Sequence, residues 1–257
     1  MWLGCVWLAL SCDDGDLTIP AFSFNSTVNN CGDLTLFKIN ENESLALVIN
    51  ADNTDNAFLN QVREDELVSV SVISYRTFES APSTSYFCQS IPPSQPILVN
   101  EWTGTGDLYI NTVRTQDDDD TIDETDLILD SDGDGYPDYI DSDDDNDGIL
   151  TKNEFAGDSD GDGILDYLDD DDDNDGVPTL NESITSDIDG DGITDYLDAD
   201  TVVINPARSL SNSYTQTFES NFTLELLKLE NSSGGTIQYD TYDFGTKTTT
   251  KSVVEDL

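Results

Sequence analysis

The sequence predicts a mainly β protein, with an N-terminal β-sandwich-like domain and a short C-terminal β segment joined by an irregular acidic repeat array. Two observations carry this prediction. Residues 17–116 and 202–257 contain β-branched and aromatic runs separated by turn signals, which is typical of short strands. Between them, residues 130–200 repeat one acidic 12-residue pattern five times, and the gaps between copies are too short for regular helices. The array is therefore expected to contain little regular secondary structure.

The chain begins with an apolar segment, residues 1–12, which gives way to an acidic run directly after Cys12. A short hydrophobic stretch that ends in a small residue before a cysteine resembles a bacterial lipoprotein signal peptide, with residues 8–12 as its recognition sequence. The resemblance implies that Cys12 becomes the lipidated first residue and that the protein lies at the outer membrane and cell surface. Two alternatives stay open: a cleaved signal without lipidation, giving a secreted or periplasmic protein, and the buried start of a cytosolic domain.

Residues 17–116 are predicted to form the β-rich N-terminal domain. The runs 44–50, 66–78 and 106–113 are rich in β-branched and aromatic residues and alternate in part between apolar and polar positions. The proline-rich stretch 91–96 suits a rigid turn between strands. Several short strands separated by turns indicate a sandwich.

The four cysteines divide between the signal and this domain. Cys5 would leave with the signal peptide and Cys12 would carry the lipid, which leaves Cys31 and Cys88. One remaining pair in an exported domain suits a disulfide, which would stabilise the fold by about 4 kcal/mol in the chain-entropy model. Two buried free thiols are the alternative. A catalytic thiol is not expected, because the chain has no histidine to activate one.

Residues 117–129 are predicted to be an acidic linker that leads into five loops. We number these loops 1 to 5: residues 130–141, 143–154, 158–169, 171–182 and 187–198. Each loop has acidic residues at positions 1, 3 and 5, glycine at position 6 and a carboxylate at position 12. The predicted ligands at positions 1, 3, 5 and 12 are Asp130, Asp132, Asp134, Asp141, Asp143, Asp145, Asp147, Glu154, Asp158, Asp160, Asp162, Asp169, Asp171, Asp173, Asp175, Glu182, Asp187, Asp189, Asp191 and Asp198.

This spacing is the one that a flexible oxygen cage for calcium needs, because alternate side chains converge on one ion and position 12 closes the shell. The loops offer hard oxygen donors without histidine or cysteine, which favours calcium over zinc or copper. We therefore expect an array whose core is calcium, about five or more ions. The alternative is a disordered, solvated acidic linker. EF-hands are excluded, since one residue separates loop 1 from loop 2 and leaves no room for the flanking helices.

The array resembles thrombospondin type 3 repeats. That family alternates a DxDGDGxxDxxD form with a DxDxDNDG form, and loops 1 to 5 follow this alternation. The resemblance implies a chain wrapped around a row of calcium ions, and it adds the position-9 aspartates Asp138, Asp166 and Asp195 to the predicted ligands. It implies calcium binding but no particular activity, because these repeats occur in many different proteins.

Residues 202–257 are predicted to form a hairpin, with strands at 213–229 and 236–244 joined by a turn at 231–235. Such a short segment could be a small separate β-domain. Alternatively, its strands complete the N-terminal sandwich and the repeat array is a long insertion.

The formal net charge of −46 makes nucleic acid an improbable partner, and the membrane is expected to be reached only through the lipid anchor. No catalytic residues are predicted, because no nucleophile, phosphate or zinc motif is present. The sequence therefore predicts a calcium-binding surface lipoprotein, not an enzyme, in which calcium rigidifies a connector for cell adhesion or envelope scaffolding. The alternative is an accessory lipoprotein that binds a glycan or protein ligand for a surface machine, with Trp102 as a marker of a ligand surface or, more simply, a core residue.

Overall fold

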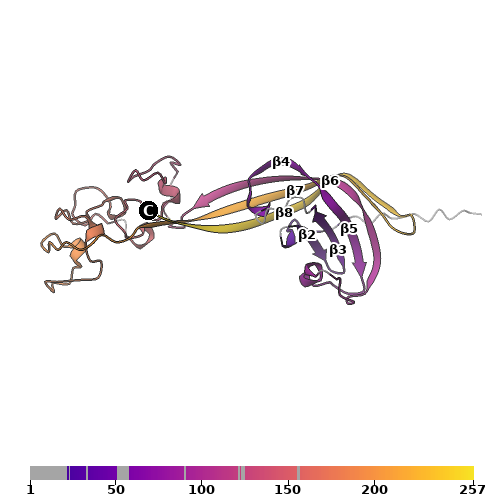
Figure 1. The fold of residues 1–257 in the computed structure, drawn as a ribbon, viewed down its shortest axis with the longest axis horizontal. Coiled ribbons are helices and arrows are strands. Elements are labelled where there is room, and N and C mark those ends of the chain that lie inside the picture. The colour runs from indigo at the N-terminus through magenta and orange to yellow at the C-terminus, as the bar shows by residue number, and fades with distance from the viewer. Residues whose placement is uncertain are drawn as a thin grey trace, which may run out of the picture. The chain divides into compact units, whose positions relative to one another are not determined.

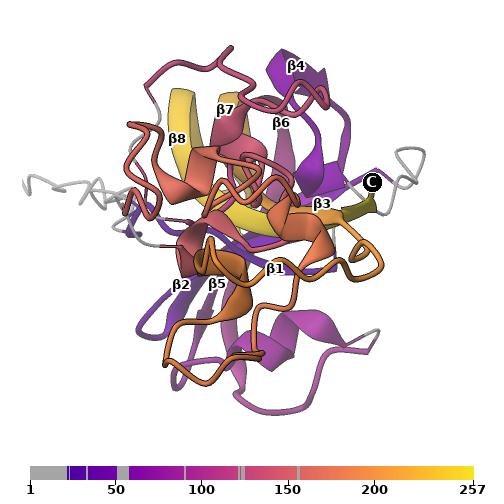
Figure 2. The ribbon, with the colours of Figure 1, turned by 90° about the vertical axis from the view of Figure 1, so that its left-hand side faces the viewer.

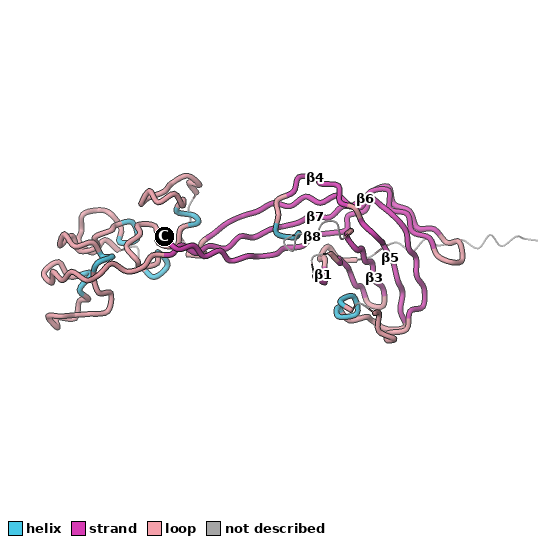
Figure 3. Tube along the Cα trace, viewed as in Figure 1, coloured by secondary structure: helices cyan, strands magenta, loops and turns pink. Residues whose placement is uncertain are grey.

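A computed structural model describes residues 22, 24–32, 34–50, 58–89, 91–120, 122, 125–154 and 157–257. The fold is mainly β, as the sequence predicts (Figures 1 and 3). The predicted signal peptide and its lipidation site, Cys12, lie outside the described residues. None of the helices in the described part of the chain is long and apolar enough to cross a membrane.

The strands form one eight-stranded sheet in the order β1-β2-β3-β5-β6-β7-β8, with β4 paired to β6. Their bounds are β1 Asn29–Cys31, β2 Thr35–Asn40, β3 Glu43–Ile49, β4 Arg63–Val68, β5 Val70–Phe78, β6 Leu98–Asp117, β7 Ser211–Glu230 and β8 Thr236–Asp256. The pairs β1–β2, β2–β3, β3–β5 and β5–β6 are antiparallel. Because β7 is the neighbour of β6, the C-terminal strands belong to the same sheet as the N-terminal ones, and the repeat array is an insertion between two adjacent strands.

The sheet nearly closes on itself. The residues before β1 reach β8 through a parallel bridge between Thr27 and Thr246, in which the Thr246 N–H donates to the Ser26 carbonyl at 2.7 Å. Gly245 permits this approach: its φ is +110°, and an added Cβ would lie 2.0 Å from the Ser26 carbonyl oxygen. Any side chain at this position would push the first and last strands of the sheet apart.

The chain forms two compact units. The first contains the described residues of 22–58, 64–111 and 221–247, and the second contains 59–63, 112–220 and 248–257. The first unit has an apolar interior: consecutive residues are buried along β2 and β3, so both faces of these strands are covered, whereas buried and more exposed residues alternate along parts of β6 and β7. Its fully buried members include Leu36, Leu45, Leu47, Ile73, Leu108, Phe222, Leu224 and Phe244.

Two further contacts hold the first unit together. Cys31 of β1 forms a disulfide with Cys88, the last residue of the 3₁₀ helix η2 (Thr84–Cys88), with a Cα–Cα distance of 5.2 Å. This confirms the predicted pair and rules out the two free thiols. Lys38 is buried on β2, where its ammonium donates to the Phe244 carbonyl at 2.6 Å, and burial lowers its pKa.

The acidic array lies in the second unit and contains no strand among its described residues 125–154 and 157–200 (Figure 2). Its only regular elements there are five single turns of 3₁₀ helix, each of which begins at position 9 of a loop. They are η3 Asp138–Ile140, η4 Thr151–Asn153, η5 Asp166–Leu168, η6 Thr179–Asn181 and η7 Asp195–Leu197. The predicted scarcity of regular structure is confirmed.

Candidate metal-binding loops

Each loop is folded by hydrogen bonds between its own carboxylates and backbone. In loop 2, Asp145 accepts the Asp147 N–H at 3.0 Å, and Asp147 accepts the Ile149 N–H at 2.6 Å. The same two contacts recur at the equivalent positions of the other four loops. These turns use one oxygen of each carboxylate to fix the backbone. The second oxygen of each carboxylate makes neither of these two backbone contacts.

The glycine at position 6 makes the sharp turn possible. Gly148 has φ +88° and Gly176 has φ +93°, and residues with a Cβ rarely adopt such a backbone conformation. In both loops the glycine N–H donates to the carboxylate at position 1, Asp143 at 3.0 Å and Asp171 at 3.1 Å. The turn therefore brings position 1 back towards positions 3 and 5.

The structure brings together the acidic side chains that the sequence predicted as ligands. In each of loops 1 to 4, one carboxylate oxygen from each of positions 1, 3 and 5 lies within 4.8 Å of the other two. Such groups could hold a metal ion. Loop 5 has the same internal hydrogen bonds at Asp187, Asp189 and Asp191.

Position 9 has a structural role in every loop. In loops 2 and 4, the hydroxyls of Thr151 and Thr179 accept the N–H of position 2 at 3.0 and 3.1 Å. In loops 1 and 3, Asp138 and Asp166 accept the same N–H at 2.8 Å, and Asp195 of loop 5 accepts it at 2.9 Å. The aspartates predicted as ligands here therefore act as braces, like the threonines, although their carboxylates retain lone pairs for an ion.

The carboxylate at position 12 differs between the two loop types. Asp141 and Asp169 each accept the N–H two residues on, and Asp198 accepts both the Asp200 N–H and the Thr201 hydroxyl. Glu154 and Glu182 have both carboxylate oxygens buried without a hydrogen-bond partner among the described residues. The longer glutamate side chain reaches past the backbone contact and leaves both oxygens available to a metal.

Loops 2 and 4 are the buried members of the array. Asp147 is 0% exposed, Asp145 is 8% exposed and Glu182 is 3% exposed, whereas Asp134, Asp162 and Asp191 at position 5 of loops 1, 3 and 5 are exposed. In the described part of the chain, the second oxygens of Asp145, Asp147, Asp173 and Asp175 are buried without a hydrogen-bond partner. A buried charged oxygen with no partner is strongly unfavourable, so these atoms fit a cation.

The pKa values express the same cost. Desolvation, followed by the charges of neighbouring carboxylates, raises the pKa of Glu182 to about 8 and that of Asp173 to about 6. Asp160 occupies in loop 3 the position that Asp173 has in loop 4, yet hydrogen bonds from the Asp162 N–H and the Asn174 amide lower its pKa. At position 3 the pKa is therefore raised in loop 4 and lowered in loop 3, although in loop 1 burial also raises the pKa of Asp132.

Side chains outside the pattern connect the loops. The amide of Asn146 in loop 2 donates to Asp132 in loop 1, and the amide of Asn174 in loop 4 donates to Asp160 in loop 3. The guanidinium of Arg208 donates to the carbonyls of Asp147 in loop 2 and Glu182 in loop 4. Sequence analysis missed Arg208, although a rare cation just beyond an acidic array was a usable signal.

One buried amide fixes the array to its own unit. Asn212, at the start of β7, is 0% exposed. Its side chain donates to the Ile140 carbonyl at 2.8 Å and accepts the Ser142 N–H at 3.1 Å. The junction between loops 1 and 2 is thereby attached to a strand of the sheet.

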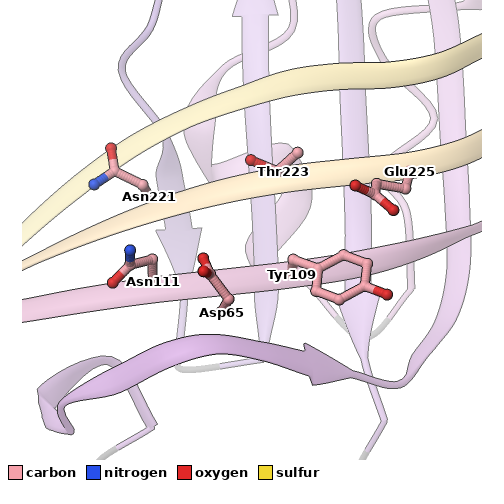
Figure 4. Close-up of a pocket in the computed structure, with 6 residues that line it drawn as sticks. All are labelled: Asp65, Tyr109, Asn111, Asn221, Thr223 and Glu225. Atoms are coloured by element: carbon pink, nitrogen blue, oxygen red, sulfur yellow. The ribbon is translucent and has the colours of Figure 1, made fainter.

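The first unit has a surface hollow of about 600 Å³, separate from the acidic loops. Polar side chains of β4, β6 and β7 line it (Figure 4), and they are Asp65, Tyr109, Asn111, Asn221, Thr223 and Glu225. Trp102 does not line this hollow. It is half-buried and packs against Tyr75 at a centroid distance of 5.2 Å, which favours the interpretation of Trp102 as a packing residue.

Comparison with known proteins returns no match to a family model, to a curated protein or to a solved structure.

Proposed function

We propose that this chain is a calcium-binding surface lipoprotein whose array is of the thrombospondin type 3 kind. The proposal rests above all on the buried carboxylate oxygens of loops 2 and 4 that have no hydrogen-bond partner among the described residues. Folded proteins rarely bury such oxygens unless an ion or a proton compensates them.

Calcium is the cation that these donors suit best. Carboxylate oxygens on a flexible loop favour a large, hard ion with many ligands, whereas magnesium demands a stricter octahedron and keeps its waters. Positions 1, 3, 5 and 12 of loops 2 and 4 would hold it: Asp143, Asp145, Asp147 and Glu154, and Asp171, Asp173, Asp175 and Glu182. The acidic residues of loops 1, 3 and 5 would supply further sites that are more open to water.

The proposed role is mechanical. Without ions, the carboxylates repel one another, because residues 117–200 contain more than half of the 55 acidic residues and only one basic residue, Lys152. Ion binding offsets this repulsion and stabilises the folded array, because the unfolded chain has no preformed site. Since the array connects the neighbouring strands β6 and β7, calcium would rigidify this connection and the protein surface that the array forms. Such a surface would serve adhesion or envelope scaffolding, anchored by lipid at Cys12.

A calcium titration of the full chain tests the proposal. Equilibrium dialysis with radioactive calcium should show saturable uptake of about five or more ions, and urea unfolding of the array should shift to higher urea with calcium and return with chelator. Weak, non-saturating uptake, with identical unfolding in calcium and in chelator, would show that the array is a solvated acidic segment.

The hollow in Figure 4 favours a second candidate, an accessory lipoprotein that binds a neutral glycan. The ring of Tyr109, next to Glu225 at one end of the hollow, offers a stacking surface for a sugar, and the amides of Asn111 and Asn221 at the other end offer hydrogen bonds. Titration with a panel of neutral oligosaccharides tests it, since binding should be lost in Tyr109→Ala and kept in Tyr136→Ala. Absence of binding throughout the panel would remove this candidate.

A further inference from the structure

Asp172 is a buried carboxylate that the 12-residue pattern leaves without a role. It occupies position 2 of loop 4, between the predicted ligands Asp171 and Asp173, and is 1% exposed. Neither of its carboxylate oxygens has a hydrogen-bond partner in the part of the chain that the structure describes. Burial of such a group is unfavourable unless something compensates its charge.

Two acidic side chains of loop 2 lie close to Asp172. One carboxylate oxygen of Asp172 lies within 4.8 Å of an oxygen from each of Asp147 and Glu154, which also lie within 4.8 Å of one another. Asp147 is 0% exposed with its Oδ2 unpaired among the described residues, and Glu154 has both oxygens unpaired there. Desolvation, and then the charge of Asp147, raises the pKa of Asp172 to about 8. Three convergent carboxylates from two loops therefore form a concentrated negative centre.

We propose that Asp172 ligates a divalent cation together with Asp147 and Glu154, so that this cation links loop 4 to loop 2. The inference rests on the proposed calcium binding and adds to it a ligand and a connection that lie outside the single-loop pattern. Each loop supplies its own cage, but this site exists only when loops 2 and 4 lie against each other.

Arg208 independently holds the two loops in this arrangement. Its guanidinium donates to one carbonyl of each loop, Asp147 and Glu182. These contacts hold the two backbones together and leave the oxygens of Asp172 and Glu154 unpaired. The cross-loop centre therefore still requires a cation after the arginine has made its contacts.

Asp172→Asn in the full chain tests the site. Asp170→Asn is the matched control, because Asp170 is exposed, lies two residues away and carries the same charge. By equilibrium dialysis with radioactive calcium, Asp172→Asn should take up one ion fewer or bind one ion at least about tenfold more weakly, since even outer-shell partners of metal sites contribute about 10- to 100-fold to affinity. Asp170→Asn should match the wild type in ion number.

Tyr196 provides a second readout. Burial, and then the charges of Asp172, Glu154 and Asp147, raise the pKa of Tyr196, which makes this tyrosine the one to test as a sensitiser for an ion at the centre. Terbium bound in place of calcium is excited through tyrosine, and Tyr196→Phe should reduce its luminescence. The reduction should be smaller when Tyr196→Phe is introduced into Asp172→Asn than when it is introduced into the wild type. Asp172→Ser is measured in parallel, with circular dichroism as the folding check, so that the conclusion does not depend on one variant.

The outcomes separate the two proposals. If the wild type takes up no saturable calcium, the proposed function itself fails. If the wild type binds calcium and both Asp172 variants match Asp170→Asn in ion number and affinity, the cross-loop site is overturned while the single-loop sites stand.

Discussion

Loops 2 and 4 share their sequence pattern with loops 1, 3 and 5, yet the two groups occupy different environments. All five fold through the same carboxylate-to-backbone hydrogen bonds. In loops 2 and 4, however, most of the predicted ligands are buried, and Glu154 and Glu182 have no hydrogen-bond partner among the described residues. In loops 1, 3 and 5 water reaches most of them, and the position-12 aspartates accept backbone N–H groups.

The difference teaches that the local pattern gathers the carboxylates, whereas tertiary packing decides how much the fold would depend on the proposed ion. An exposed carboxylate without metal is hydrated and loses little. A buried one loses its hydration and repels its neighbours, so the state without a cation is more unfavourable in loops 2 and 4 than in loops 1, 3 and 5, where Asp141 and Asp195 are the exceptions that bury an oxygen without a partner among the described residues. Under the proposed function, loops 1, 3 and 5 would exchange a bound ion with less consequence for the fold.

The largest expected effect is that of removing calcium. Hydrogen exchange followed by mass spectrometry should show protection of residues 143–154 and 171–182 falling about 100-fold when chelator replaces calcium at about 100 times its Kd, which corresponds to about 2.7 kcal/mol. Peptides from residues 130–141, 158–169 and 187–198 should change less, and the disulfide-linked β1 and η2 region should not respond. Equal loss of protection in all five loops would contradict the division into two groups.

In a buried loop, a substitution at position 12 should be unfavourable when calcium is present and stabilising when calcium is absent. With calcium, Glu182→Gln removes a predicted ligand and should weaken calcium binding at least about tenfold. In chelator the same change replaces a buried carboxyl, whose ionised form is unfavourable there, by a neutral amide, and should raise the free energy of unfolding by about 1–3 kcal/mol. Urea titrations in the two conditions measure both effects.

Asp198→Asn in loop 5 is the matched control for this substitution. Both Asp198 oxygens already accept hydrogen bonds, one from the Asp200 N–H at 3.3 Å and one from the Thr201 hydroxyl at 3.0 Å. It should therefore show no stabilisation in chelator. A stabilisation equal to that of Glu182→Gln would mean that the lack of hydrogen-bond partners for Glu182 among the described residues does not distinguish the two loops, since both side chains are buried.

The sequence predicts the local structure of the five loops, but it does not predict which loops are buried by tertiary packing. The ligand spacing, the glycine turns and the β character of residues 44–50 and 106–113 follow from patterns within a few residues, and the structure contains them. The run 66–78 is β-rich, as its composition predicts, but it is divided between β4 and β5 at Ser69, whose carbonyl accepts the Asn50 N–H at 2.9 Å. That contact joins residues far apart in the chain.

The roles of Arg208 and Asp172 were inaccessible for the same reason. Arg208 lies about 60 residues from Asp147, to which it donates, and no local periodicity links them. The 12-residue pattern marks positions 1, 3, 5 and 12, so a carboxylate at position 2 looks like solvated surface until loop 4 is seen beside loop 2.

Arg208 allows the contact between the buried loops to be broken without removing a ligand. Arg208→Met keeps much of the side-chain volume but loses the hydrogen bonds to the Asp147 and Glu182 carbonyls, so the free energy of unfolding in calcium should fall by about 1–3 kcal/mol. Arg114→Met removes the same charge from an exposed position of the same unit and should change it by less than about 0.5 kcal/mol. Urea unfolding in saturating calcium checks both, and equal effects would reduce Arg208 to a general contribution of charge.

The smallest expected effect concerns the brace at position 9. Thr179 is 0% exposed and its hydroxyl accepts the Asp172 N–H at 3.1 Å, so Thr179→Val keeps the shape and leaves that N–H unpaired. Loss of this contact should lower the free energy of unfolding by about 1 kcal/mol, measured by urea unfolding in calcium. Asp166→Asn in exposed loop 3 keeps a side-chain oxygen for the Ser159 N–H and should have a smaller effect. If Thr179→Val proves neutral while Asp166→Asn is destabilising, position 9 acts through ion binding and not through the backbone, and the distinction between the loops would then lie in the ligand set itself.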